Sequence, residues 1–68
     1  MDTKQTILRV NATYHLRVEV GGSIQRGEKI NEGPETDESS RAPVSGIVKS
    51  IRFDAERHEF VLVIAPAD

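Results

Sequence analysis

The first third of the chain alternates between apolar and polar side chains. From residue 8 to residue 20 every second position is apolar: Leu8, Val10, Ala12, Tyr14, Leu16, Val18 and Val20. A period of two is typical of a β-strand with one buried face. A straight strand of this length would reach roughly 43 Å, which is too long for a small domain. We therefore expect the segment to bend or to split near Ala12 while keeping one apolar face.

Glycines follow this run and predict two turns. Gly21 and Gly22 end the alternation, and Gly27 follows a short segment whose apolar side chain is Ile24. Glycine adopts the backbone conformations that tight turns need, and residues 28–30 can then resume as a brief strand. A phosphate-binding loop is the other interpretation, but such loops lead into a helix, and none is predicted after Gly27. We expect structural turns.

A polar segment divides the chain. Residues 31–41 contain no apolar side chain, which predicts an exposed loop with no core residue. The sequence then returns to regular structure at a compact turn that contains Pro43 and Gly46. Proline fixes its own φ and disfavours a helix at the residue before it.

Two strands joined by a hairpin are predicted in the last third of the chain. Residues 47–53 alternate between apolar and polar, except that Val48 breaks the pattern. Residues 54–59 are polar and predict the hairpin tip. The continuous aliphatic run at 60–64 is typical of a strand covered on both faces. Together with the earlier segments, this predicts an all-β fold of six or seven short strands.

Length and composition predict a single domain over residues 1–68. The 68 residues are 37% hydrophobic and 4% aromatic, so the core must be small and aliphatic. The chain has no cysteine, which excludes disulfides and thiolate metal sites. A net charge of -2 disfavours nucleic-acid binding, which usually requires a basic surface. The longest apolar run, 60–65, is far shorter than a membrane span. We expect a cytoplasmic protein with no nucleic-acid partner and no membrane insertion.

Catalytic and metal-binding side chains are few. The two histidines are His15, on the polar side of the first alternating run, and His58, in a charged turn. Neither has a partner at the spacing of a zinc site, and Glu56 beside His58 is most simply a solvated turn residue. We therefore expect no enzyme, no catalytic residue, no metal and no cofactor.

Four carboxylates gather in the polar segment: Glu32, Glu35, Asp37 and Glu38. They can steer a basic partner to the loop, or they can be solvated charges that prevent association between sheet edges. If the protein docks a partner, we expect the surface to combine this loop with the outward positions of Arg17 and Glu19. The sequence identifies no partner and no oligomeric state.

Two segments resemble the biotinyl/lipoyl-like domains. Residues 18–30, Val-Glu-Val-Gly-Gly-Ser-Ile-Gln-Arg-Gly-Glu-Lys-Ile, are similar to the V-x-V-G-D-x-V-x-x-G-q-x-I signature, and residues 42–51, Ala-Pro-Val-Ser-Gly-Ile-Val-Lys-Ser-Ile, to A-P-V-S-G-x-V-x-x-I. The resemblance implies a barrel-sandwich hybrid, a flattened β-barrel of two small antiparallel sheets. An unmodified N-terminal domain found in the Rnf-type electron-transport complex has a similar pattern, including a short hairpin in place of residues 52–59.

In modified members of this family, a lysine at a hairpin tip carries biotin or lipoate. The segment Glu-Thr-Asp-Glu ending at Glu38 resembles the lipoyl-type E-T-D-K tip, but Glu38 stands where the lysine would be. The biotinyl-type M-K-M tip is absent. The resemblance thus implies an unmodified protein docking or scaffold module, of a kind that serves in an electron-transfer or multienzyme assembly. The alternative is a carrier protein with an atypical attachment lysine, Lys29 or Lys49.

Overall fold

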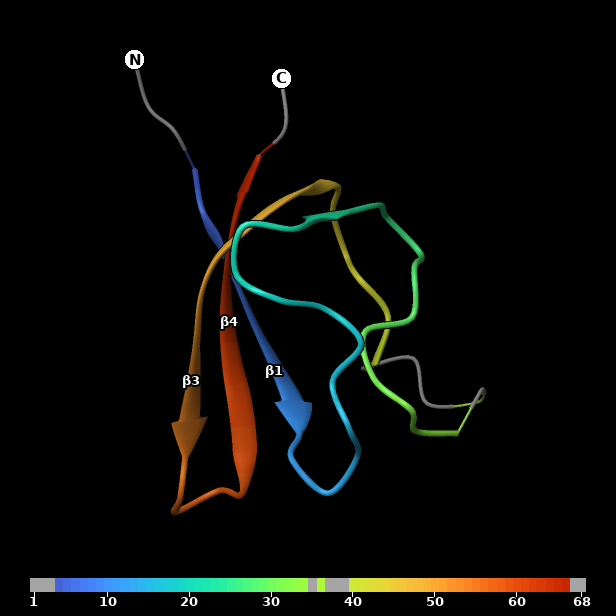
Figure 1. Ribbon diagram of the computed structural model, residues 1–68, viewed down its shortest axis with the longest axis vertical. Coiled ribbons are helices and arrows are strands. Elements are labelled where there is room, and N and C mark those ends of the chain that lie inside the picture. The colour runs from blue at the N-terminus through green and yellow to red at the C-terminus, as the bar shows by residue number, and fades with distance from the viewer. Residues whose placement is uncertain (1–3, 35, 37–39, 67–68) are drawn as a thin grey trace.

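The computed structural model describes residues 4–34, 36 and 40–66, and it confirms an all-β domain. Four strands form one antiparallel sheet: β1 (Thr6–Asn11), β2 (Ser23–Ile24), β3 (Gly46–Asp54) and β4 (Glu59–Pro66). Their order in the sheet is β1-β4-β3-β2. The sheet curls strongly, like half of a barrel (Figure 1).

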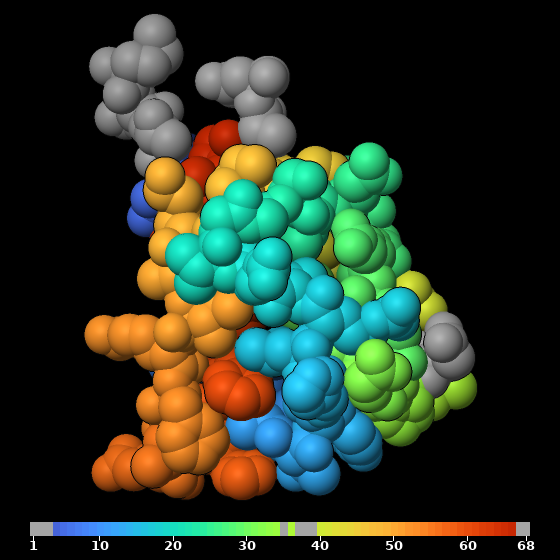
Figure 2. All heavy atoms as spheres, in the orientation of Figure 1, coloured from blue at the N-terminus to red at the C-terminus, as the bar shows by residue number. Residues whose placement is uncertain are grey.

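The expectation of two sheets and of six or seven strands was wrong for the part of the chain that is described. Residues 12–22 and 25–45 contribute only two isolated bridges, Leu16 with Asn31 and Lys29 with Arg41. Turns at the glycines and at Asn11 interrupt the ladders before further strands can form. These residues cover the concave face of the curled sheet as irregular chain, and they form much of the face shown in Figure 2.

The core lies between the sheet and this irregular segment. Its buried side chains are almost all aliphatic, as the composition predicted, and they come from both layers. They are Val10, Ile24, Ile30, Ala42, Val48, Leu62 and Ile64, with Leu8, Leu16, Val18, Val44, Ile51 and Phe60 packed against them. The molecule measures 36 × 25 × 16 Å.

The first alternating run forms a strand only as far as Asn11. The side-chain Oδ1 of Asn11 accepts a hydrogen bond from the backbone N–H of Thr13 at 2.8 Å, and this turn ends the ladder. The alternation nevertheless continues beyond the turn, because Leu16 and Val18 pack against the core. Val20 is exposed. The predicted split near Ala12 is therefore confirmed, with irregular chain in place of a second strand.

The segments on either side of the polar loop pair with each other. Backbone hydrogen bonds join Gly21 and Gly22 to Val48, Gly27 and Glu28 to Ala42, and Ile30 to Ser40. The segments run antiparallel in one register, and β2 is the stretch within them that pairs as a regular strand with β3. Residues 21–30 and 40–48 thus form an irregular hairpin with the polar loop at its tip.

The predicted hairpin between β3 and β4 is confirmed. The side-chain Oδ1 of Asp54 accepts hydrogen bonds from the backbone N–H groups of Glu56 at 3.0 Å and Arg57 at 3.2 Å, which orders the turn. His58 closes the turn with φ of 54°, a left-handed conformation that histidine tolerates better than most residues do.

A β-bulge explains why Val48 breaks the alternation of β3. Val48 lies opposite Ile64 and Ser50 lies opposite Val63, so Lys49 is an extra residue in β3. The extra residue reverses the parity of the strand. Val48 and Ile51 therefore both point into the core, and Ile47 points to the opposite face.

β4 is the central strand of the regular part of the sheet, with β1 and β3 as its neighbours. Leu62 and Ile64 are buried on the concave face, whereas Val61 and Val63 on the convex face are half-buried. The expectation that this strand is covered on both faces thus holds for the concave face.

Candidate docking surface

Arg17 and Glu32, two members of the expected docking surface, are close together in the structure. The backbone N–H of Arg17 donates to the carbonyl of Ile30 at 2.8 Å, and the N–H of Glu32 donates to the carbonyl of His15 at 3.0 Å. This pairing places Arg17 Nε 3.6 Å from Glu32 Oε2. Both side chains are more than half exposed, so the ion pair is open to solvent.

An open hollow of about 370 Å³ continues this surface. Arg17, Glu19 and Glu28 line it together with backbone and apolar groups of Leu16 and Val18. Two carboxylates and one guanidinium already held by Glu32 make its rim acidic, which suits cationic side chains better than an anionic ligand.

The base of the polar loop is ordered by buried polar groups. Asn31 is buried, and its Oδ1 accepts a hydrogen bond from the N–H of Gly33 at 2.9 Å. Lys29 Nζ donates to the carbonyl of Gly33. A side chain at Gly33 would crowd the ring of Tyr14 and the Asn31 amide, so this turn requires glycine. The expectation of a wholly exposed 31–41 segment was therefore wrong.

Ser40, at the other end of the loop, is also buried. The composition of a segment does not show that its first and last polar residues are covered by other parts of the chain. Sequence reasoning missed Asn31 for this reason, although the pattern Asn-x-Gly is a signal for a turn of this kind.

The remaining loop carboxylates, Glu35, Asp37 and Glu38, lie outside the described residues. The prediction that they belong to the docking surface, and that Glu38 occupies the position of the attachment lysine, therefore stays a prediction. Glu32 is the loop carboxylate whose surroundings are known.

The expected turn residues occupy several different positions. Gly21 and Gly27 have φ of 90° and 88°, values that L side chains rarely adopt. Gly22 donates its N–H to the carbonyl of Glu19 at 3.0 Å. Pro43 lies in a bend, and Gly46 is the first residue of β3, where a Cβ would overlap the carbonyl oxygen of Ala65.

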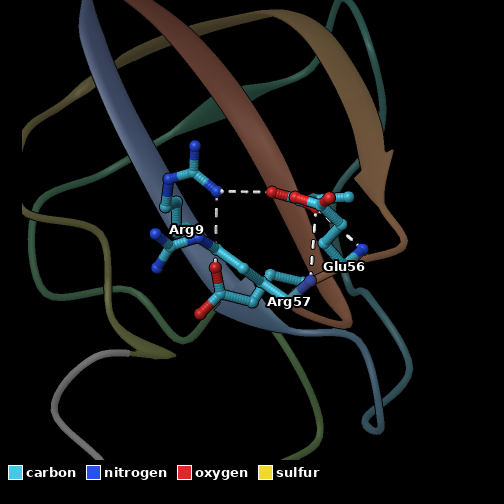
Figure 3. A network of polar contacts seen from close by, with 5 residues as sticks. Arg9, Glu56 and Arg57 are labelled. Atoms are coloured by element: carbon cyan, nitrogen blue, oxygen red, sulfur yellow. Dashed lines mark hydrogen bonds and ion pairs between the residues drawn. The ribbon is translucent and has the colours of Figure 1, made fainter.

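A second polar cluster, which the sequence did not predict, lies on the convex face of the sheet. Arg9 Nη1 of β1 contacts Asp54 Oδ2 at 3.0 Å and Glu59 Oε1 at 3.4 Å, as Figure 3 shows. The hydrogen bond from Arg9, reinforced by the N–H groups of Arg57 and Glu56, holds the pKa of Asp54 below its ordinary value. The hydrogen bond to Asp54 raises the pKa of Arg9. Both groups therefore stay charged at neutral pH, and the cluster is an ion pair network and not a proton-transfer site.

His15 and His58 are both exposed and lie in different parts of the molecule. The ring of His58 contacts the ring of Phe53 edge-on, with centroids 5.8 Å apart. Within the described ranges, no three His, Asp or Glu side chains are placed to hold a metal ion. No helix in the same ranges is long and apolar enough to cross a membrane.

Comparison with known proteins finds no family model, no curated protein and no solved structure that matches this chain. The fold and surfaces described above define a small all-β protein with a curled four-stranded antiparallel sheet.

Proposed function

We propose that this chain is a non-catalytic, unmodified domain of the biotinyl/lipoyl-like type, which docks other proteins as a scaffold in an electron-transfer or multienzyme assembly. The observation that carries the proposal is the pairing of the two signature segments. Residues 18–30 and 42–51 resemble the family separately in the sequence, and their backbones are hydrogen-bonded to each other from Gly21 and Val48 to Glu28 and Ala42.

The surroundings of the lysines support the unmodified form. The loop at the tip of the irregular hairpin, residues 31–39, contains no lysine. Lys29 lies just before this loop, is half-buried and donates from Nζ to the carbonyl of Gly33. An attachment lysine must present its amine to a ligase, so this hydrogen bond disfavours Lys29. Lys49 is exposed at the β-bulge of β3 and not at a hairpin tip.

Intact-mass measurement separates the module from a carrier. The protein is co-expressed with a lipoate ligase and a biotin ligase, alongside K29R and K49R variants. An unchanged mass for the wild-type chain is the expected result. A mass gain of one lipoyl or biotinyl group that disappears in K29R or K49R would show a carrier and overturn the proposal.

The docking role is tested with a defined basic probe, because electrostatic steering by carboxylates favours cationic partners at low salt. An octalysine peptide is titrated into the labelled protein, and the backbone amide shifts are followed by NMR. We expect the shift changes to centre on Glu19, Glu28 and Glu32.

The matched comparison neutralises the loop carboxylates by E32Q, E35Q, D37N and E38Q. This variant should bind the peptide at least about tenfold more weakly at low salt, because four favourable charge interactions are removed. The control, E56Q, neutralises an exposed carboxylate on the opposite hairpin and should bind as the wild type does. Equal binding by the four-site variant would remove this surface from consideration.

A further inference from the structure

The curled sheet has two very different edges. At one edge, β2 is two residues long and is followed closely by the Gly27 turn, so it offers little backbone for further pairing. At the other edge, β1 presents six residues, Thr6–Asn11. An unpaired edge strand of this length is a template for another strand unless a charge, a proline or a bulge protects it.

The backbone of β1 alternates between groups that bond β4 and groups that face outward. The N–H of Ala12 donates to the carbonyl of His58, the residue directly opposite it in the β1–β4 register. In an antiparallel ladder every second residue exchanges both hydrogen bonds with its partner, so Leu8 and Val10 bond β4 in the same way. The N–H and C=O groups of Ile7 and Arg9 therefore point to the open edge.

The usual protections of an edge strand are missing from β1. The strand contains no proline and no lysine, and its register with β4 has no bulge. Arg9 is its one charged residue. The guanidinium of Arg9 is drawn back over the sheet by Asp54 of β3 and Glu59 of β4, away from the open edge (Figure 3). Ile7, beside it, is 58% exposed.

We propose that β1 pairs with β1 of a second copy of this chain, in antiparallel orientation around a twofold axis at Ile7. A register centred on Ile7 places the two exposed isoleucines opposite each other and sets each Arg9 opposite Gln5 of the second copy. A register centred on Arg9 would oppose two like charges, and one centred on Leu8 would oppose Ile7 to Arg9. The pairing is isologous, so it closes as a dimer and does not extend into a filament.

Strand addition joins the two sheets into one of eight strands. Three opposed pairs, Ile7 with Ile7 and two of Gln5 with Arg9, can exchange six backbone hydrogen bonds. A single pair of strands buries less surface than the roughly 1,200 Å² of a stable complex. The dimer is therefore a concentration-dependent one, and it forms independently of the acidic surface around Glu32.

Sedimentation equilibrium from about 10 µM to 1 mM tests the proposal. The mass of the wild-type protein should rise from 7.5 kDa toward twice that value as the concentration increases. I7P removes an N–H that bonds nothing within the chain and places a proline ring at the edge, so it should weaken the dimer at least about tenfold while the monomer stays folded. Circular dichroism verifies the fold.

Further variants keep the test decisive if I7P does not fold. I7K retains the backbone N–H but puts two positive charges at the twofold axis, and it should also remain monomeric. I7T, which keeps a β-branched side chain, should dimerise measurably. I47K places the same lysine on the convex face of β3, away from the β1 edge, and should dimerise as the wild type does.

The possible outcomes divide clearly. A dimer that I7P or I7K abolishes and I47K retains supports pairing through β1. A wild-type monomer at 1 mM overturns the proposal. So does a dimer that survives I7K, or one that only I47K abolishes, because the latter would mean that the copies stack through their convex faces.

Discussion

The two layers of this molecule bury the same kind of side chain by different means. In the regular part of the sheet, β1, β4 and β3 form continuous ladders, and Ile64 at their centre is fully buried. In the irregular layer, one strand of two residues and two isolated bridges provide the regular pairing, yet Ile30 is equally buried. Burial in this domain thus depends on where apolar side chains recur and not on whether the backbone around them is a strand.

The difference lies in how the backbone is satisfied. The sheet satisfies its backbone groups by strand pairing alone. The irregular layer combines cross-chain backbone hydrogen bonds with side-chain acceptors such as Asn31 and with glycines at positive φ such as Gly27. We expect the two layers to respond equally to loss of core volume and differently to loss of polar groups.

The largest effect is expected from matched truncations of the two buried isoleucines. I30A and I64A remove the same atoms from the two layers, and each should lower the free energy of unfolding by about 2–5 kcal/mol. A domain of this size has a total stability of roughly 3–10 kcal/mol, so either variant can be largely unfolded. The graded pair I30V and I64V should cost about 0.5–1.5 kcal/mol each in urea denaturation.

The control for these truncations is V20A, because Val20 lies in the irregular layer but is exposed and should change stability little. A loss in I64V without a loss in I30V would mean that the irregular layer is only loosely attached to the sheet. The two layers would then not share one core.

A smaller effect is expected from removing the side-chain acceptors of two similar turns. Asn31 and Asn11 each accept a hydrogen bond at Oδ1 from the N–H two residues later, but the first turn is buried and the second is exposed. N31A should cost about 1–3 kcal/mol, because it leaves the N–H of Gly33 buried and unpaired. N11A should cost less than about 1 kcal/mol, since water replaces the lost acceptor. Equal costs in urea denaturation would contradict the importance of burial.

Alternation in the sequence predicted the faces of the molecule better than it predicted the strands. Leu16 and Val18 turn toward the core as the period of two requires, although they lie in irregular chain. The strand ended at Asn11 because a side-chain hydrogen bond to Thr13 competes with the ladder, and periodicity does not detect this competition. The fold class and the β3–β4 hairpin could therefore be predicted, and the number of sheets could not.

The candidate surface was predictable only in part, because it depends on contacts between distant residues. Charge pattern alone grouped Arg17 with the acidic loop, and the structure places it beside Glu32. Nothing in the sequence indicated that Arg9 would join Asp54 and Glu59, since that contact requires the strand order β1-β4-β3. The β-bulge at Lys49 was visible in the sequence only as the irregular position of Val48.

The smallest effect is expected at the ion pair on the convex face of the regular sheet, and it is specific to acid pH. The pKa of Asp54 is lowered in the folded protein, first by the hydrogen bond from Arg9. A carboxyl group whose pKa falls on folding stabilises the protein above its unfolded pKa, and that contribution is lost as the pH falls below about 4. D54N keeps an oxygen that can accept from the N–H groups of Glu56 and Arg57 but removes the charge. The stability difference between wild type and D54N should thus be constant near neutral pH and shrink on acidification, as urea denaturation at pH 7, 4 and 2.5 would measure. R9Q should show the same weakened dependence on pH, and a difference that grew toward low pH would contradict the assignment.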